Sequence, residues 1–179
     1  MTTSPRPSFP RARAALAVLS LLAVTTAGIA TAAADVGVGD RAAEFRRVSD
    51  ENGQAVTLGA HRGKVVVVTF GASWCAPCRR ELPALEKVAA HYASRDADVA
   101  FIAINIDRDR ATGVRFMNEF DFEHVQAAFD PNSATARLYA PPAMPSTYII
   151  GKRGLVRVVH EGYRPGDEKT IRQAVDRLL

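Results

Sequence analysis

The stretch Val65–Cys78, which reads VVVVTFGASWCAPC, decides the fold of this 179-residue chain. It opens with an unbroken run of β-branched and aromatic residues, which is typical of a strand buried on both faces of a sheet. It ends with two cysteines three positions apart, and these are the only cysteines in the chain. Apolar residues then recur at helical spacing as far as Tyr92, so we expect a helix that begins at the cysteine pair.

Strands and helices alternate through the rest of the chain. A second apolar run at 101–106 predicts another central strand, and weaker helical patterns follow at 110–120 and 132–139. Two short apolar runs on either side of Gly151–Gly154 predict a hairpin. A last amphipathic helix closes the chain, and Asp167 is its expected N-cap.

A shorter hairpin is expected ahead of the decisive stretch. Residues 45–48 and 55–58 lie on either side of Asn52-Gly53, which is a strong turn signal. The whole pattern predicts an α/β fold, a three-layer sandwich in which helices cover both faces of a central mixed sheet. Neither an internal repeat nor a low-complexity linker interrupts residues 35–179, so we expect one domain there.

Residues 1–34 have the pattern of a secretory signal peptide. Three arginines and no acidic residue precede an uncharged stretch at 14–34, which ends in Ala32-Ala33-Ala34. The same stretch is long enough to serve as a membrane anchor, and this alternative stays open. In either case we expect the domain to work in the periplasm or another extracytoplasmic space, with 14–34 as its tether if the segment is retained.

Charge and composition exclude several classes of protein. Three of the 23 basic residues fall within 1–34, and the remaining 20 nearly balance the 19 acidic residues, so no basic stripe is left to follow nucleic acid. Aromatic residues make up only 7% of the chain, which disfavours a stacking platform for bases. Two cysteines can neither staple a small fold nor supply the four ligands of a structural zinc site. We therefore expect no nucleic acid partner, no metal and no cofactor.

The cysteine pair has the geometry of a redox-active dithiol. Residues three apart in the first turn of a helix are neighbours, so Cys75 and Cys78 can close a disulfide. Cys75 would lie at the helix N-terminus, where free N–H groups and the helix dipole favour its thiolate, whereas Cys78 would be shielded one turn inside. This asymmetry predicts that Cys75 attacks a substrate disulfide and that Cys78 resolves the mixed disulfide.

Residues 65–85, VVVVTFGASWCAPCRRELPAL, resemble the thioredoxin superfamily. The sequence is more similar to the extracytoplasmic TlpA/ResA-like branch, through Arg62-Gly63-Lys64, the WCxPCRxE run, and an extra helix and strand at 108–130. The resemblance covers residues 38–179 and implies a thioredoxin-like sandwich with an N-terminal hairpin and an inserted helix and strand. One departure is Thr69, which stands where typical thioredoxin has a buried aspartate.

The resemblance also assigns roles around the cysteine pair. Glu81 resembles the active-site glutamate of that branch and would relay a proton, against the alternative of a solvated helix residue. Pro145 resembles the cis-proline that faces the two sulfurs, against the alternative of an ordinary loop proline, and Met144 before it would pair with an extended substrate. Trp74 would form a flat surface that shields Cys75 and contacts substrate, with simple packing as the alternative.

These residues together predict a thiol–disulfide oxidoreductase, which in this branch is more often a reductase. Its partners would be oxidised proteins of the cell envelope and an upstream electron donor that the sequence does not identify. Apocytochrome c is one implied substrate, although Met144-Pro145-Ser146 differs from the run that cytochrome c maturation members often carry.

Two alternative functions stay open. A peroxiredoxin-like peroxidase would place a threonine or serine three residues before its reactive cysteine, where Ala72 stands instead. A copper-binding or metallochaperone module could use Cys75, Cys78 and Met144, because copper favours soft sulfur ligands. The best-known copper relatives, however, have three residues between their cysteines rather than two.

Overall fold

The structure is a computed structural model that describes residues 1–2 and 35–179. The predicted signal peptide at 1–34 and the tether at 14–34 therefore lie, apart from the first two residues, outside the described part of the chain. Within the described residues, no helix combines the length and the apolar character that crossing a membrane requires.

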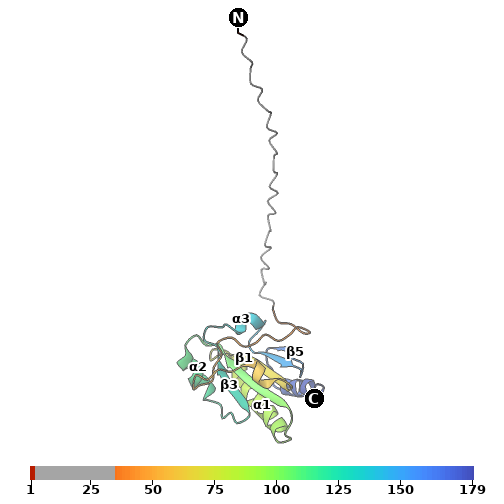
Figure 1. The fold of residues 1–179 in the computed structure, drawn as a ribbon. Helices are drawn as coiled ribbons and strands as arrows, with labels where there is room; N and C mark the ends of the chain where they lie inside the picture. Colours follow the sequence, from red (N-terminus) through yellow and green to blue (C-terminus); the bar gives the residue numbers. More distant parts are fainter. Residues whose placement is uncertain (3–34) are drawn as a thin grey trace. The chain divides into compact units, whose positions relative to one another are not determined.

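A five-stranded mixed sheet forms the middle layer of the domain, in the order β3-β2-β1-β4-β5 (Figure 1). The strands are β1 (Val65–Gly71), β2 (Val99–Asn105), β3 (Val125–Phe129), β4 (Ser146–Ile150) and β5 (Val156–Glu161). Strands β1, β2 and β3 run parallel, whereas β4 runs antiparallel to both β1 and β5. Every residue of β1 is buried, which confirms the prediction from its unbroken apolar run.

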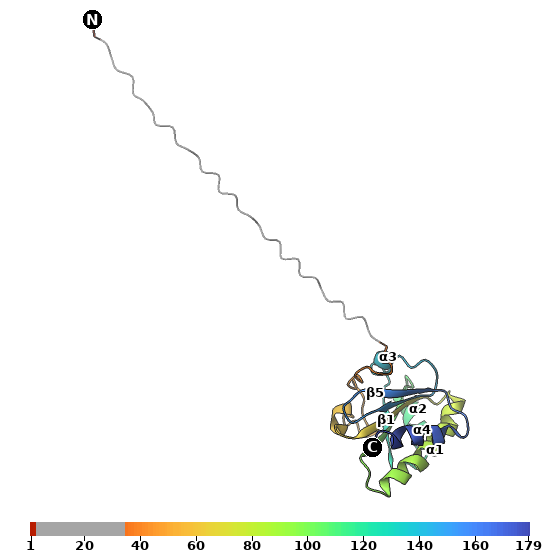
Figure 2. The same cartoon turned by 90° about the vertical axis from the view of Figure 1, so that its right-hand side faces the viewer.

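Helices lie on both faces of this sheet, as predicted. They are a short 3-10 helix η1 (Leu58–His61) and the α-helices α1 (Ala76–Ala93), α2 (Arg110–Met117), α3 (Ala136–Tyr139) and α4 (Asp167–Asp176). The long helix α1 and the C-terminal helix α4 lie on one side of the sheet, and α3 lies on the other (Figures 1 and 2). The inserted α2 and β3 confirm the extra helix and strand expected at 108–130.

Two apolar clusters, one on each face of β1, hold the layers together. Side chains alternate along a strand, so Val65 and Val67 pack with Leu82 of α1, whereas Val66 packs on the opposite face with Tyr139 of α3. Burying a side chain of this kind contributes about 1.5–3 kcal/mol. The irregular segment at 36–56 also packs into the second cluster, so this face depends less on helices than the first.

The N-terminal hairpin expected around Asn52-Gly53 is reduced to a tight turn. Neither 45–48 nor 55–58 forms a strand. Ser49 makes one bridge across the turn and exchanges two backbone hydrogen bonds with Phe129 at the end of β3, at 3.2 and 2.8 Å. Across the turn, the Asp50 amide donates to the Gln54 carbonyl at 2.8 Å and the Val56 amide donates to the Val48 carbonyl at 3.0 Å, and the pairing ends at this one bridge.

The predicted N-cap of α4 is wrong by one residue. Gly166, not Asp167, occupies the cap position. The Asp167 carboxylate faces the preceding loop and strand, where Oδ2 accepts a hydrogen bond from the Arg164 amide at 2.8 Å and lies 3.1 Å from His160 Nε2. This carboxylate therefore ties β5 and its loop to the start of α4 instead of accepting from the first amides of the helix.

Candidate active site

Strand β1 ends beside the start of α1, and the cysteine pair lies at that junction. Cys75 is the N-cap of α1, Cys78 lies in its first turn, and a disulfide joins them with their Cα atoms 5.3 Å apart. The Cys75 Sγ accepts a hydrogen bond from the Cys78 amide at 3.2 Å. In the reduced protein, this amide and the helix dipole would stabilise a thiolate at Cys75.

Cys78 is the more deeply enclosed of the two sulfurs. It has no exposed surface, whereas 4% of Cys75 is exposed. A side chain at Gly71 would bring its Cβ within 3.3 Å of the Cys78 Sγ, so the glycine lets this sulfur pack against the end of β1. Both cysteines are buried in the apolar cluster between the sheet and α1, and their different roles stay a prediction.

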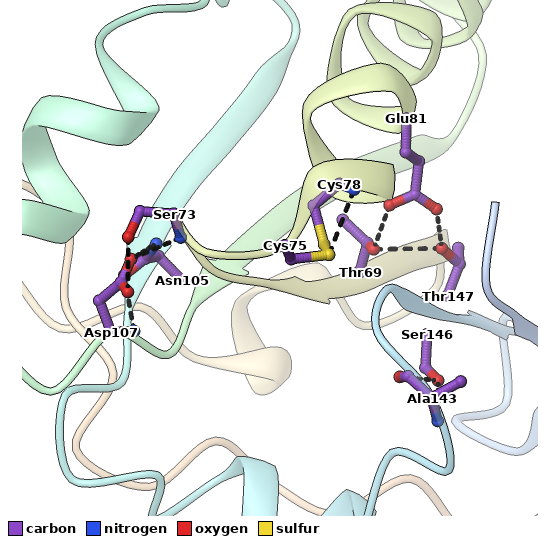
Figure 3. The surroundings of a disulfide bond; sticks show 10 residues. All are labelled: Thr69, Ser73, Cys75, Cys78, Glu81, Asn105, Asp107, Ala143, Ser146 and Thr147. Carbon is purple, nitrogen blue, oxygen red and sulfur yellow. Dashed lines mark hydrogen bonds between the residues drawn. A yellow bond between two sulfur atoms is a disulfide. The ribbon is translucent and has the colours of Figure 1, made fainter.

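Glu81 is fully buried one turn after Cys78, so it is not a solvated helix residue. Its Oε2 accepts from the Thr69 hydroxyl at 2.8 Å, its Oε1 accepts from the Thr147 hydroxyl at 2.6 Å, and the two hydroxyl oxygens are 3.1 Å apart (Figure 3). Three contacts connect these groups, but two hydroxyls supply only two protons. All three contacts become hydrogen bonds when the Glu81 carboxyl brings the third proton.

The surroundings of Glu81 favour its protonated form. Burial raises the pKa of Glu81 to about 7, although the hydroxyls of Thr147 and Thr69 and the nearby His160 act in the opposite direction. Asp167 adds a smaller effect that raises the pKa further. A carboxyl group that exchanges its proton near neutral pH is suited to acid–base work at the neighbouring sulfurs.

The sequence did not reveal the two threonines as partners of Glu81. Thr69 and Thr147 are directly opposite each other in the β1–β4 register, although 78 positions separate them along the chain. The sequence showed only that Thr69 replaces an aspartate of typical thioredoxin. In the structure, the buried acid comes from the helix instead of from the strand.

A second buried carboxylate holds the loop before Cys75, and the sequence reasoning missed it. Asp107 accepts hydrogen bonds from the amide and hydroxyl of Ser73, at 2.8 and 2.9 Å, and from the Asn105 side-chain amide at 2.8 Å (Figure 3). Any side chain at Gly113 in α2 would overlap the Asn105 amide, so this glycine allows the close approach. The available signal was the pair of polar residues at the end of a buried strand, Asn105 in its last position and Asp107 two positions later.

The loop before β4 reaches the same end of the sheet. Ser146, the first residue of β4, pairs with Phe70 near the end of β1, so Pro145 lies beside the cysteine-bearing junction. The Met144–Pro145 peptide is cis, and the Pro145 carbonyl accepts from the Gly162 amide at 2.7 Å.

The side chains on either side of Pro145 fix this loop. The Ser146 hydroxyl donates to the Ala143 carbonyl at 2.7 Å, and Met144 packs against both apolar clusters (Figure 3). Trp74, by contrast, is 65% exposed directly before Cys75. Its indole is therefore a surface feature at the junction rather than part of the core.

No group of three or more His, Cys, Asp or Glu side chains within the described residues could hold a metal ion. The copper-binding alternative rests on a different set of atoms, the sulfurs of Cys75, Cys78 and Met144. It stays a prediction that metal titration of the reduced protein would test.

Comparisons with known proteins agree with the fold and with the cysteine pair. The sequence pattern of the family described as Redoxin matches residues 37–176. Thiol-disulfide oxidoreductase ResA of Oceanobacillus iheyensis is 31% identical over 128 residues, and the match covers 70% of this chain and 65% of that protein, slightly less than two thirds of its length. Thioredoxin-like protein YneN of Bacillus subtilis is 30% identical over 130 residues, which cover 72% of this chain and 75% of that protein.

The similarity extends to solved structures. A crystal structure from Chlorobium tepidum, described as that of a thiol:disulfide interchange protein DsbE, matches with a TM-score of 0.72 and 31% identity. The match covers 80% of this chain and 98% of that one. These likenesses confirm the thioredoxin-like fold and the resemblance to ResA-like proteins that the sequence predicted.

Proposed function

The chain belongs to the Redoxin family, and from this premise we propose that it is a thiol–disulfide oxidoreductase that reduces disulfide bonds in proteins outside the cytoplasm. The observation that carries the proposal is the disulfide between Cys75, the N-cap of α1, and the enclosed Cys78. This arrangement places the Cys75 sulfur beside a backbone donor and leaves the Cys78 sulfur to resolve the mixed disulfide.

The reaction starts from the reduced pair. The Cys75 thiolate attacks one sulfur of the substrate disulfide, forms a mixed disulfide, and releases the other substrate sulfur as a thiolate that takes up a proton. The Cys78 thiol then loses its proton and attacks the Cys75 sulfur, which releases the second substrate thiol. Two electrons pass to the substrate, its two sulfurs take up one proton from the solvent and one equivalent to the proton lost by Cys78, and the protein is left with the Cys75–Cys78 disulfide.

Glu81 serves as the proton acceptor for Cys78 in the second step. Residues three apart on a helix face the same side, so Glu81 and the sulfur that must be deprotonated share one buried face of α1. The hydroxyls of Thr69 and Thr147 can rotate to donate or to accept, and so satisfy the carboxyl in both protonation states. A pKa of Glu81 near 7 suits this exchange at neutral pH.

The substrate approaches from the side of Trp74 and of the Pro145 loop. The exposed indole offers a flat apolar surface beside Cys75, and Met144 offers its backbone to an extended segment of the substrate. The N-terminal segment at 1–34 supports export of the domain, either by cleavage or by retention of 14–34 as a tether. The substrates would then be oxidised proteins of the cell envelope, and a second protein would return electrons to the pair.

The decisive experiment combines turnover with trapping. Purified protein should accelerate the reduction of insulin disulfides by dithiothreitol, and Cys75→Ala should abolish this activity. Cys78→Ala should accumulate a mixed disulfide between Cys75 and the substrate, which mass spectrometry would identify. A Cys78→Ala protein that reduces insulin at the full rate, or that never forms the mixed disulfide, would contradict the proposed function.

A further inference from the structure

The surface between α1 and α4 is hollowed into a groove of about 550 Å³, here called the α1–α4 groove. Its floor is apolar, with Pro83, Ala84 and Val88 of α1 on one side and Tyr163 and Pro165 on the other. The lining extends along α1 from Arg80 to His91, so the groove is about 16 Å long at the helical rise of 1.5 Å per residue. About five residues of an extended polypeptide would fill that length.

The rim of the groove is cationic. Arg80 and Lys87 project from α1, and Lys169 and Arg172 project from α4. All four side chains are exposed, and within the described residues none of them forms an ion pair.

One acid, Glu168, lines the groove, and its carboxylate is already occupied. It accepts hydrogen bonds from the Tyr163 hydroxyl and from the Gly166 amide, both at 2.9 Å. The hydrogen bond from Tyr163 and those from the backbone lower the pKa of Glu168, so it keeps its charge in place at the loop. Four cations and one fixed carboxylate leave the groove with a net positive charge.

The groove and the site of disulfide exchange share two stretches of chain, the loop after β5 and the first turns of α1. Gly162, whose amide donates to the Pro145 carbonyl at 2.7 Å, directly precedes the lining residue Tyr163. On the other wall, Arg80 lies only two positions after Cys78 along α1. A polypeptide that passes Cys75 beside the Pro145 loop can therefore continue over Gly162 into the groove.

We propose that the α1–α4 groove binds an acidic segment of the protein whose disulfide the cysteine pair exchanges, a proposal that rests on the proposed function. The cationic rim attracts carboxylates, and the apolar floor takes the side chains between them. Charges at such a rim act mainly on the rate of encounter, so the interaction weakens as salt screens them. Partners with an acidic stretch near the reactive disulfide are thus selected over neutral ones.

The test uses two synthetic peptides, each with one internal disulfide. They differ only in a flanking stretch of four glutamates in one and four glutamines in the other. Dithiothreitol keeps the protein reduced, and the measured quantity is KM for each peptide after the uncatalysed rate is subtracted. A small neutral disulfide, bis(2-hydroxyethyl) disulfide, is reacted separately with prereduced protein that has been freed of dithiothreitol. A cysteine-free, fluorescent version of each peptide reports binding independently of the redox reaction.

The variant is Lys87→Glu combined with Lys169→Glu, and the matched control is Lys64→Glu combined with Lys152→Glu. Lys64 precedes β1 and Lys152 lies in the β4–β5 turn, so the control makes the same charge change at the opposite end of the sheet. The groove variant should raise KM for the glutamate peptide on the order of tenfold at low salt, and much less at about 0.5 M salt. The glutamine peptide and the small disulfide should react at unchanged rates, which also shows that the variant is folded.

Two results would overturn the proposal. One is equal binding of the glutamate and glutamine peptides to the unaltered protein. The other is an equal loss of affinity for the glutamate peptide in the control variant. The effect would then come from the net charge of the molecule and not from the groove. Failure of the proposed function is recognised separately, because the small disulfide would then remain unreduced while the fluorescent peptides still report on the groove.

Discussion

Replacing Glu81 by glutamine should change how the stability of the oxidised protein depends on pH. The carboxyl is fully buried, and burial raises its pKa from 4.5 to about 7. The folded state therefore binds the proton more tightly than the unfolded state does. The stabilisation from this group is complete below pH 4.5, declines as pH rises from 4.5 to 7, and is absent above that range.

The size of the effect follows from the same shift. Moving a pKa from 4.5 to about 7 corresponds to about 3 kcal/mol of unfolding free energy between the two ends of the pH range. Glu81→Gln removes the titrating group and keeps the shape of the side chain. The difference in unfolding free energy between the unaltered protein and the variant should therefore change by about 3 kcal/mol from pH 4.5 to pH 8.

Urea unfolding of the disulfide-bonded proteins, followed by far-ultraviolet circular dichroism at several pH values, measures this difference directly. Taking the difference removes the contributions of the other carboxyl groups, including Asp130, whose pKa burial also raises. Glu119→Gln is the control, because Glu119 is exposed and pairs with Arg79 at the surface. If the curves of Glu81→Gln and of the unaltered protein run parallel from pH 4.5 to pH 8, the buried carboxyl does not titrate as argued.

Three further predictions concern the cysteine pair and the loop before it. In the reduced protein, iodoacetamide should modify Cys75 much faster than the enclosed Cys78, and peptide mapping that finds the reverse order would contradict the assigned roles. Trp74→Ala should slow exchange with a disulfide-bonded peptide severalfold while changing stability by less than about 0.5 kcal/mol, since the indole is exposed; a thermal melt and a rate measurement separate the two. Asp107→Ala should destabilise the protein by about 3 kcal/mol, because it strands the half-buried donors of Ser73 and the buried amide of Asn105. Asp107→Asn should cost less than half of this, because its amide oxygen can replace one carboxylate oxygen. Equal urea midpoints for these two variants would show that the hydrogen bonds do not hold the loop.

The parts of the fold that the sequence predicted are those determined by local pattern. The unbroken apolar run at 65–70 and the helical spacing after it describe β1 and α1 without reference to the rest of the chain. The turn at Gly151–Gly154 is local in the same sense, since the Gly154 amide donates to the Gly151 carbonyl at 2.7 Å. The N-terminal segment could not be predicted in this way, because its backbone pairs with Phe129, far away in sequence, as well as across its own turn.

The same distinction between local pattern and distant contacts applies to the candidate site. The spacing of the cysteine pair is a local signal, and it located Cys75 and Cys78 correctly at the start of a helix. The environment of Glu81 depends on which residues of β1 and β4 lie opposite each other, and a sequence shows no such register. A glutamate on an amphipathic helix looks solvated unless one knows that two threonines from different strands meet it in the core.

The two buried carboxyl groups beside the cysteine pair differ in the kind of partner they have. Two of the three partners of Asp107 are N–H groups, which can only donate, so this carboxylate acts as an acceptor that holds a loop. The partners of Glu81 are two hydroxyls, which can donate or accept, so this site tolerates a carboxyl that gains and loses a proton. An apolar side chain at position 81 would fill the same space without the loss of about 3 kcal/mol above neutral pH. Packing alone therefore does not explain a glutamate there, whereas the proposed proton transfer at Cys78 would.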